Sequence, residues 1–198
     1  MKIVHEELLI DKGDISITEE WIDVHAEIYQ AIASVVWLPN TADFTINPTR
    51  HGNGVKPIKE GCMVTLEEYF GWQPEATIPV LDDNKPGKVD ALKQISLGNI
   101  VFEWETGNIS SSHRALNKIA LGMLNGTIVA GILVLPTRKL YPYLTDRIGN
   151  YEELQPYFPV WRELPVDYGL TLVIAIEHDA VDETVPLIAK GTDGRALI

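Results

Sequence analysis

The hydrophobic pattern predicts helices and strands that alternate along most of the chain. Apolar residues from Trp21 to Val35 recur at helical spacing, so residues 17–36 are predicted to be a helix that Ser16 or Thr18 caps. Further helices are predicted over 65–72, 113–125, 139–144 and 151–158. Strands, two of them continuous apolar runs of the buried kind, are predicted over 99–105, 127–135 and 169–176. This order indicates an α/β fold whose sheet is largely covered by helices.

Two segments are predicted to be irregular because turn-forming residues dominate them. Residues 38–61 are rich in Pro, Gly, Asn and Thr, and residues 81–88 read LDDNKPGK. The first of these segments also holds a short basic patch with no acidic residue inside it, formed by Arg50, His51, Lys56 and Lys59.

The totals describe an acidic globular protein. A length of 198 residues predicts a single domain over 1–198, and 45% apolar residues can bury a real core. The net charge of -12 argues against a nucleic-acid partner, because phosphate binding normally needs a basic surface. Net charge averages over all faces, however, so a basic cleft can lie within an acidic body.

The residue inventory also limits the chemistry. A single cysteine, Cys62, excludes a disulfide within the chain and a zinc site built from several cysteines. The sequence has no apolar run long enough for a signal peptide or a membrane span, which predicts a cytoplasmic protein without a membrane partner.

The most informative motif is the pair Glu103 and Glu105 on the predicted strand 99–105. Spacing of two places both carboxylates on one face, while Ile100, Phe102 and Trp104 occupy the other. Burying paired carboxylates costs free energy unless a metal ion or a cationic side chain compensates. The alternative is a half-exposed strand with a solvated acidic face.

Asp90 precedes this pair by thirteen positions and follows a predicted turn. An aspartate followed by Glu-x-Glu on a strand is a looser form of the nuclease pattern of an aspartate and (Asp/Glu)-x-Lys. Mg²⁺ prefers such hard oxygen ligands, and two ions can activate water at a phosphodiester. Spacing of this kind also arises by chance, so the pattern alone leaves the function open.

The segment from Gly107 to Arg114 leads from the acidic strand into a helix. Helix N-termini attract phosphate, and Asn108 and Arg114 suit adenine and guanine edges. The alternative is an ordinary serine cap. Asp146 and Arg147 form a surface ion pair by default.

At this point the residues match a known family. The run FEWETGNISSSHRALNKIALG resembles the catalytic strand and following helix of BamHI-type restriction endonucleases. Further matches in the same order cover most of the chain after residue 40, namely FTIN at 44–47, NGVKPIKE at 53–60, YLTDR at 143–147, YEELQPYF at 151–158 and PLIAKGTDG at 186–194.

The resemblance implies a homodimeric type II restriction endonuclease with a PD-(D/E)XK core, a central mixed sheet flanked by helices. It implies cleavage of double-stranded DNA at GGATCC after the first G, leaving 5′ GATC ends. Asp90 and Glu103 would be the main ligands of Mg²⁺, with two ions per site and Mn²⁺ as a substitute. Glu75 aligns with a further acidic residue of the site, and Glu105 would orient or deprotonate the attacking water.

The resemblance also implies how DNA and the second subunit would bind. The family's major-groove residues match Asn108, Ser110, Arg114, Asp146 and Arg147. Lys59 is a candidate phosphate contact, and Asp193 and Gly194 match a segment near the minor groove. The helices that begin near 113 and 151 would form the dimer interface, where Leu124 and Asn125 replace polar or charged family residues.

Three other functions stay open at this point. The chain could be a nuclease of the same fold with another specificity, or a DNA-binding protein that has lost cleavage. It could also be an acidic metal-binding or scaffold protein, which the net charge favours and the ordered motif matches disfavour.

Overall fold

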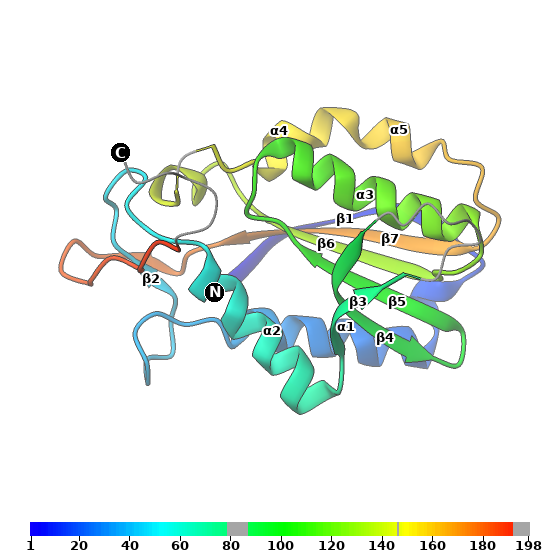
Figure 1. Cartoon of the computed structure of the whole chain (residues 1–198), viewed down its shortest axis with the longest axis horizontal. Coiled ribbons are helices and arrows are strands. Elements are labelled where there is room, and N and C mark those ends of the chain that lie inside the picture. Colours follow the sequence, from blue (N-terminus) through cyan, green and yellow to red (C-terminus); the bar gives the residue numbers. More distant parts are fainter. Residues whose placement is uncertain (79–86, 146, 192–198) are drawn as a thin grey trace.

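The computed structural model describes residues 1–78, 87–145 and 147–191, and its centre is a six-stranded mixed sheet in the order β1-β7-β6-β5-β4-β3 (Figure 1). The strands β5, β6 and β7 are parallel, whereas β1, β4 and β3 each run antiparallel to their neighbours. Their bounds are β1 Lys2–Lys12, β3 Gln73–Thr77, β4 Lys88–Ile95, β5 Gly98–Trp104, β6 Ala130–Pro136 and β7 Gly169–Glu177.

Helices cover both faces of this sheet, which confirms the predicted α/β class (Figure 1). One face carries α1 (Glu19–Ala33) and α2 (Lys56–Phe70). The other face carries α3 (Ile109–Leu124), α4 (Tyr151–Leu154) and α5 (Phe158–Arg162). Short 3₁₀ turns are formed by Ile15–Ile17, Tyr141–Tyr143 and Gln155–Tyr157. No helix in the described ranges is long and apolar enough to cross a bilayer.

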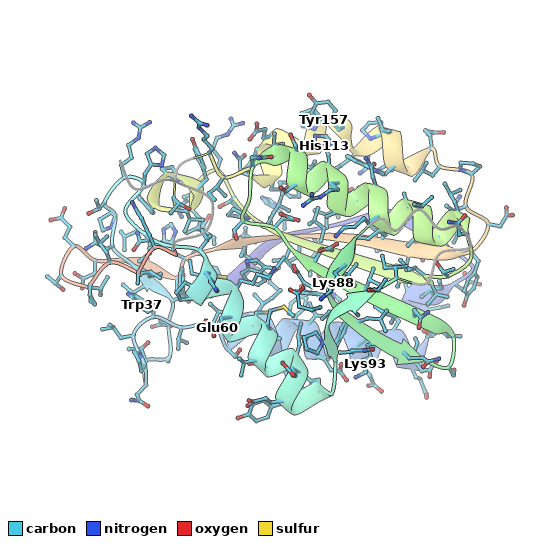
Figure 2. All side chains as sticks on the ribbon, viewed as in Figure 1. Trp37, Glu60, Lys88, Lys93, His113 and Tyr157 are labelled. Atoms are coloured by element: carbon cyan, nitrogen blue, oxygen red, sulfur yellow. The ribbon has the colours of Figure 1, made fainter. Side chains whose placement is uncertain are left out.

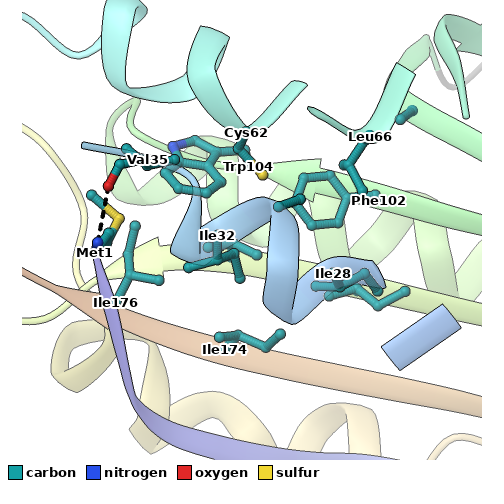
Figure 3. Packing of buried hydrophobic residues seen from close by; sticks show 14 of the residues in the cluster. Met1, Ile28, Ile32, Val35, Cys62, Leu66, Phe102, Trp104, Ile174 and Ile176 are labelled. Carbon is teal, nitrogen blue, oxygen red and sulfur yellow. Dashed lines mark hydrogen bonds between the residues drawn. The ribbon is translucent and has the colours of Figure 1, made fainter. Parts of the chain in front are cut away.

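The sheet separates two hydrophobic cores, and β5 contributes alternate residues to each. Phe102 and Trp104 pack towards α1 and α2, among Ile28, Cys62 and Leu66 (Figure 3). Val101 packs on the opposite side with residues of α3. The predicted alternation of β5 is therefore confirmed, and both of its faces are buried rather than one.

Several elements differ from the prediction. The strands β1, β3 and β4 were not predicted, and α2 begins at Lys56 rather than at 65. Pro57 lies in the first turn of α2. Backbone N–H groups in a first turn have no partner within the helix, so the missing N–H of proline costs nothing there. The Pro- and Gly-rich composition of 56–61 therefore does not prevent a helix. Similarly, α3 begins at Ile109 rather than 113, and 139–144 contains only a 3₁₀ turn. Residues 81–86 of the predicted turn lie outside the described residues.

Three distant segments are joined at the end of the molecule beside a small parallel sheet, β2 (Thr45–Ile46) and β8 (Ala180–Val181). The fully buried Asn53 makes the central contacts. Its side-chain amide donates to the carbonyls of Asn47 and Tyr143 at 2.8 and 2.9 Å. Its Oδ1 accepts from the N–H of Ile188 at 3.2 Å. Asn53 thus holds segments 47–55, 141–144 and 186–190 in one unit.

Candidate active site

Asp90 and Glu103 lie on the neighbouring antiparallel strands β4 and β5. The backbone N–H of Trp104 donates to Asp90 Oδ2 at 2.7 Å, so the aspartate lies against the carboxyl end of β5. Its other oxygen contacts the ammonium of Lys59 on α2. The β4–β5 hairpin therefore brings together two acids that are thirteen positions apart in the sequence.

Glu103 is buried, with only 2% of its surface exposed. Its Oε1 forms an ion pair with Lys118 on α3, and no hydrogen bond of regular geometry satisfies that oxygen. Burial raises the pKa of Glu103 to about 7, although the ammonium of Lys118 opposes this rise and the charges of Asp90 and Glu105 add to it. The interpretation of a solvated acidic face is therefore wrong for Glu103.

Glu105 is the first residue after β5, and its backbone N–H donates to the carbonyl of Val134 at 2.8 Å. Burial and the charge of Asp90 raise the pKa of Glu105, whereas Lys59, Lys118 and Arg114 lower it. Asp90, Glu103 and Glu105 therefore lie within electrostatic reach of one another. We refer to these three residues as the carboxylate cluster.

Glu75 is not paired with the carboxylate cluster, although the β3–β4 register places it between the pairs Pro74–Ala91 and Ala76–Val89, beside Asp90. It is on β3, its side chain is 68% exposed, and it forms an ion pair with Lys88 at 3.9 Å. Within the described part of the chain, no hydrogen bond or ion pair joins Glu75 to the three clustered acids. The structure thus couples three of the four acids expected at the site and places the fourth, Glu75, on the adjacent strand with an exposed side chain.

The cluster offers the ligands of a hard divalent cation. Among the described residues, no three Asp, Glu, His or Cys side chains are arranged so that they could hold a metal ion as they stand. The donors nevertheless fit Mg²⁺, because they are carboxylate oxygens. In addition, the buried Glu103 Oε1 has an ion pair with Lys118 but no hydrogen bond of regular geometry. Asp90 and Glu103 would hold the cation through oxygens that two lysines contact in this structure.

The residues expected to read bases lie on the surface next to this cluster. The carbonyl of Gly107 accepts from the N–H of Gly149 at 2.8 Å, so the loop before α3 touches the loop that contains Arg147. Four of the candidate residues are exposed, namely Asn108, Ser110, Arg114 and Arg147. Three others, Asp146, Asp193 and Gly194, lie outside the described residues.

The interpretation of an ordinary serine cap does not hold for α3. Asn108 occupies the cap position, and its side chain makes no capping hydrogen bond.

Lys59 differs from expectation in another way. Its ammonium is held by Asp90, and its side chain is only 32% exposed. Lys59 therefore belongs to the electrostatics of the carboxylate cluster as well as to the surface beside it.

Comparison with known proteins decides the family. The sequence matches the family model described as restriction endonuclease BamHI over residues 1–195. This chain belongs to the BamHI family of restriction endonucleases. The resemblance inferred from the motifs is confirmed, and this BamHI-family chain is a type II restriction enzyme, a site-specific deoxyribonuclease.

Two curated relatives of this BamHI-family enzyme support the assignment. It is 48% identical over 197 residues to the type II restriction enzyme OkrAI of Oceanobacter kriegii, covering 100% of both chains. It is 36% identical over 200 residues to the type II restriction enzyme BamHI of Bacillus amyloliquefaciens, covering 96% of this chain and 92% of that one.

A solved structure supports the fold of the BamHI-family enzyme. The crystal structure of restriction endonuclease BglII complexed with a DNA 16-mer matches 90% of this chain and 79% of that chain. The TM-score is 0.59 at 15% sequence identity. The predicted restriction-endonuclease-like core, with its central mixed sheet flanked by helices, is confirmed.

Positive side chains lie on three joined segments at one end of the BamHI-family enzyme, beside exposed Asp182 and Glu183 of the segment around β8, although the net charge is -12. The N–H of His51 donates to the carbonyl of Pro142 at 2.8 Å, and the N–H of Gly54 donates to that of Ile188 at 2.9 Å. These bonds join segments that carry the exposed cations Arg50, Lys56, Arg138, Arg147 and Lys190. Because α2 begins in this region, the cationic end is continuous with Lys59 and the carboxylate cluster.

A second surface of the BamHI-family enzyme exposes apolar side chains along α3 and the α4–α5 segment. The exposed fractions are 41% for Leu121, 48% for Leu124, 51% for Tyr157 and 63% for Val160. His113 of α3 packs against Tyr157, with ring centroids 4.8 Å apart (Figure 2). We call this surface the α3–α5 face.

Sequence reasoning missed one residue of the site, Lys118. A signal was available, because Ala115, Lys118 and Gly122 follow at helical spacing and all three are buried. A lysine within the buried stripe of a helix requires a partner of opposite charge. Its partner Glu103 lies on the strand that α3 covers.

Proposed function

We propose that this BamHI-family enzyme cuts double-stranded DNA at GGATCC after the first G, in a Mg²⁺-dependent reaction that leaves 5′ GATC ends. The observation that carries the proposal is the position of the carboxylate cluster. It lies at the carboxyl end of β5, directly before the helix whose start exposes Asn108, Ser110 and Arg114. We propose further that residues 1–198 form one catalytic and DNA-binding domain.

In this proposal each acid of the cluster has its own task. Asp90 and Glu103 would hold the cations, and two Mg²⁺ or Mn²⁺ ions would supply charge stabilisation at the phosphate and acidify water. A water oxygen bonds to phosphorus in line with the leaving oxygen, whose bond to phosphorus breaks. Glu105, the acid of the cluster that is not assigned to the cation, accepts the proton that this water loses. The leaving oxygen takes up a proton from solvent, which completes the hydrolysis.

The base contacts follow from side-chain chemistry. Arg114 and Arg147 suit guanine, Asn108 suits adenine, and Asp146 suits the amino group of cytosine. Ser110 adds a further hydrogen-bonding group, Lys59 would meet a phosphate, and Asp193 and Gly194 would lie near the minor groove. The BglII match is a complex with a DNA 16-mer, so a chain of this fold binds DNA. The cationic end described above supplies the basic surface that the net charge conceals.

Digestion of a phage genome tests this function. We expect purified protein with Mg²⁺, but not with EDTA, to produce fragments whose sequenced ends all begin 5′ GATC and derive from GGATCC. Discrete ends from another sequence would retain the nuclease and refute the proposed base contacts. Intact DNA with both Mg²⁺ and Mn²⁺ would refute the proposed metal-dependent reaction.

We also propose that the enzyme is a homodimer formed through the α3–α5 face. A twofold-symmetric dimer matches a palindromic site, because each subunit then reads an identical half-site. The exposed apolar side chains at Leu121, Leu124, Tyr157 and Val160 provide the apolar area that such an interface buries. This chain departs from the family here, because Leu124 and Asn125 replace polar or charged residues, so the detailed contacts of its interface would differ from those of the family.

Replacement of Leu124 by Glu tests the dimer. Twofold symmetry places the new charge on both subunits of one interface, so we expect the dissociation constant of the dimer to rise at least about 100-fold. Sedimentation velocity measures this change. Val64→Glu is the matched control, since Val64 on α2 is similarly exposed at 41% and lies on the opposite face of the sheet. Equal dimer stability in both variants would contradict the assigned interface.

A further inference from the structure

Lys118 is unusual for a lysine of a DNA-cutting enzyme because its side chain is almost fully buried. Only 8% of the residue is exposed, although it carries a positive charge. Its ammonium contacts Glu103 Oε1 and also donates to the backbone carbonyl of Lys88 at 2.7 Å. Because α3 buries Lys118 against the sheet, its ammonium contacts groups inside the site and does not face the surface where DNA would bind.

We propose that Lys118 is an internal counter-ion of the metal site, which pairs with the Glu103 carboxylate and orients it in the metal-free enzyme, and which is displaced from Glu103 when a divalent cation binds. This inference rests on the proposed function, in which Glu103 is a metal ligand. The ammonium and the cation would compete for the same buried oxygen, because Glu103 Oε1 has no regular hydrogen bond elsewhere.

The surroundings of Lys118 allow such an exchange. Once displaced from Glu103, the ammonium can keep its hydrogen bond to the carbonyl of Lys88, so it is not left without a partner. Without the ammonium, the buried Glu103 side chain of the metal-free enzyme loses its charged partner, which costs stability. Lys59 differs in this respect, because it is more exposed and its partner Asp90 has a second contact from the N–H of Trp104.

The test compares Lys118→Met with a matched control. Lys93 on β4 is another enclosed lysine, 21% exposed, and it pairs with Glu27 outside the carboxylate cluster (Figure 2). Thermal melts in EDTA and calorimetric titration with Ca²⁺ are measured for both variants. We expect both to melt about 6 °C or more below the wild type. Only Lys118→Met should bind Ca²⁺ more tightly, by about tenfold, which a purely structural lysine would not cause.

Two more variants keep the test decisive. Lys118→Gln, which lacks the charge but can still hydrogen-bond, should tighten Ca²⁺ binding even if Lys118→Met does not fold. Glu103→Gln/Lys118→Met should recover much of the melting temperature in EDTA and lose the Ca²⁺ response.

The outcomes separate this inference from the proposed function. Ca²⁺ affinity in Lys118→Met and Lys118→Gln equal to or weaker than in the wild type would overturn the counter-ion role, while wild-type Ca²⁺ binding and Mg²⁺-dependent cleavage persist. A wild-type enzyme that neither binds Ca²⁺ nor cuts DNA with Mg²⁺ would instead refute the proposed metal-dependent function.

Discussion

Glu103→Gln is expected to reduce DNA cleavage by a factor of at least about 10³ while leaving DNA affinity within about threefold of the wild type. The carboxylate lies at the centre of the cluster. Loss of the metal ion that it holds would raise the activation free energy of cleavage by several kcal/mol. Glutamine keeps the volume of the side chain and an oxygen that Lys118 can contact. Single-turnover cleavage with Mg²⁺ and binding to a GGATCC duplex without metal provide the two measurements.

Glu60→Gln is the matched control for this experiment. Glu60 lies on α2 with its side chain exposed (Figure 2), so removal of its charge should leave both cleavage and binding nearly unchanged. If Glu103→Gln retained cleavage within tenfold of the wild type, Glu103 could not be a metal ligand in the reaction. A parallel loss of binding would indicate a general structural defect instead.

Asn53→Ala is expected to lower the free energy of unfolding by about 3 kcal/mol, because the carbonyl of Asn47 and the buried N–H of Ile188 lose their side-chain partner. The carbonyl of Tyr143 loses one of its two donors and keeps the backbone N–H of Asn53 at 3.0 Å. The same loss loosens the cationic end, so we also expect weaker DNA binding. Urea denaturation at equilibrium measures the stability change, and a duplex titration measures the affinity.

Asn99→Ala provides a comparison with the same chemical change. The side chain of Asn99 makes a single hydrogen bond, to the carbonyl of Thr127 at 2.9 Å, and it is half-buried. We expect this replacement to cost about 1 kcal/mol. A similar cost for both variants would show that Asn53 is not the link between the three segments.

Part of the site could be predicted from local sequence. The spacing of Glu103 and Glu105 on an alternating apolar strand indicated paired acids next to a core, and the following residues indicated the start of a helix. Asp90 was predicted only through the nuclease pattern, because its strand β4 was not recognised. The alternation of KVDALKQI is imperfect, and contact with β5 decides that this segment is a strand.

The charges around the acids could not be predicted in the same way. Lys59 and Lys118 lie 31 positions before Asp90 and 15 positions after Glu103, on helices that cover opposite faces of the sheet. No spacing rule links a lysine to an acid over such distances. The helical start of α2 was likewise missed, because composition indicated a loop and packing of Ile58, Cys62 and Leu66 formed a helix.

By itself, the sequence determined the α/β class, the burial of β6 and β7, the acidic pair and the family motifs. All of these depend on residues close together in the chain, whose spacing decides which face they share. The tertiary structure alone decided that both faces of β5 are buried, that Asp90 and Glu103 are each paired with a lysine, and that the cationic segments join through Asn53. These contacts depend on strand pairing and helix packing between distant segments, because charge compensation in a buried site is a property of three-dimensional distance.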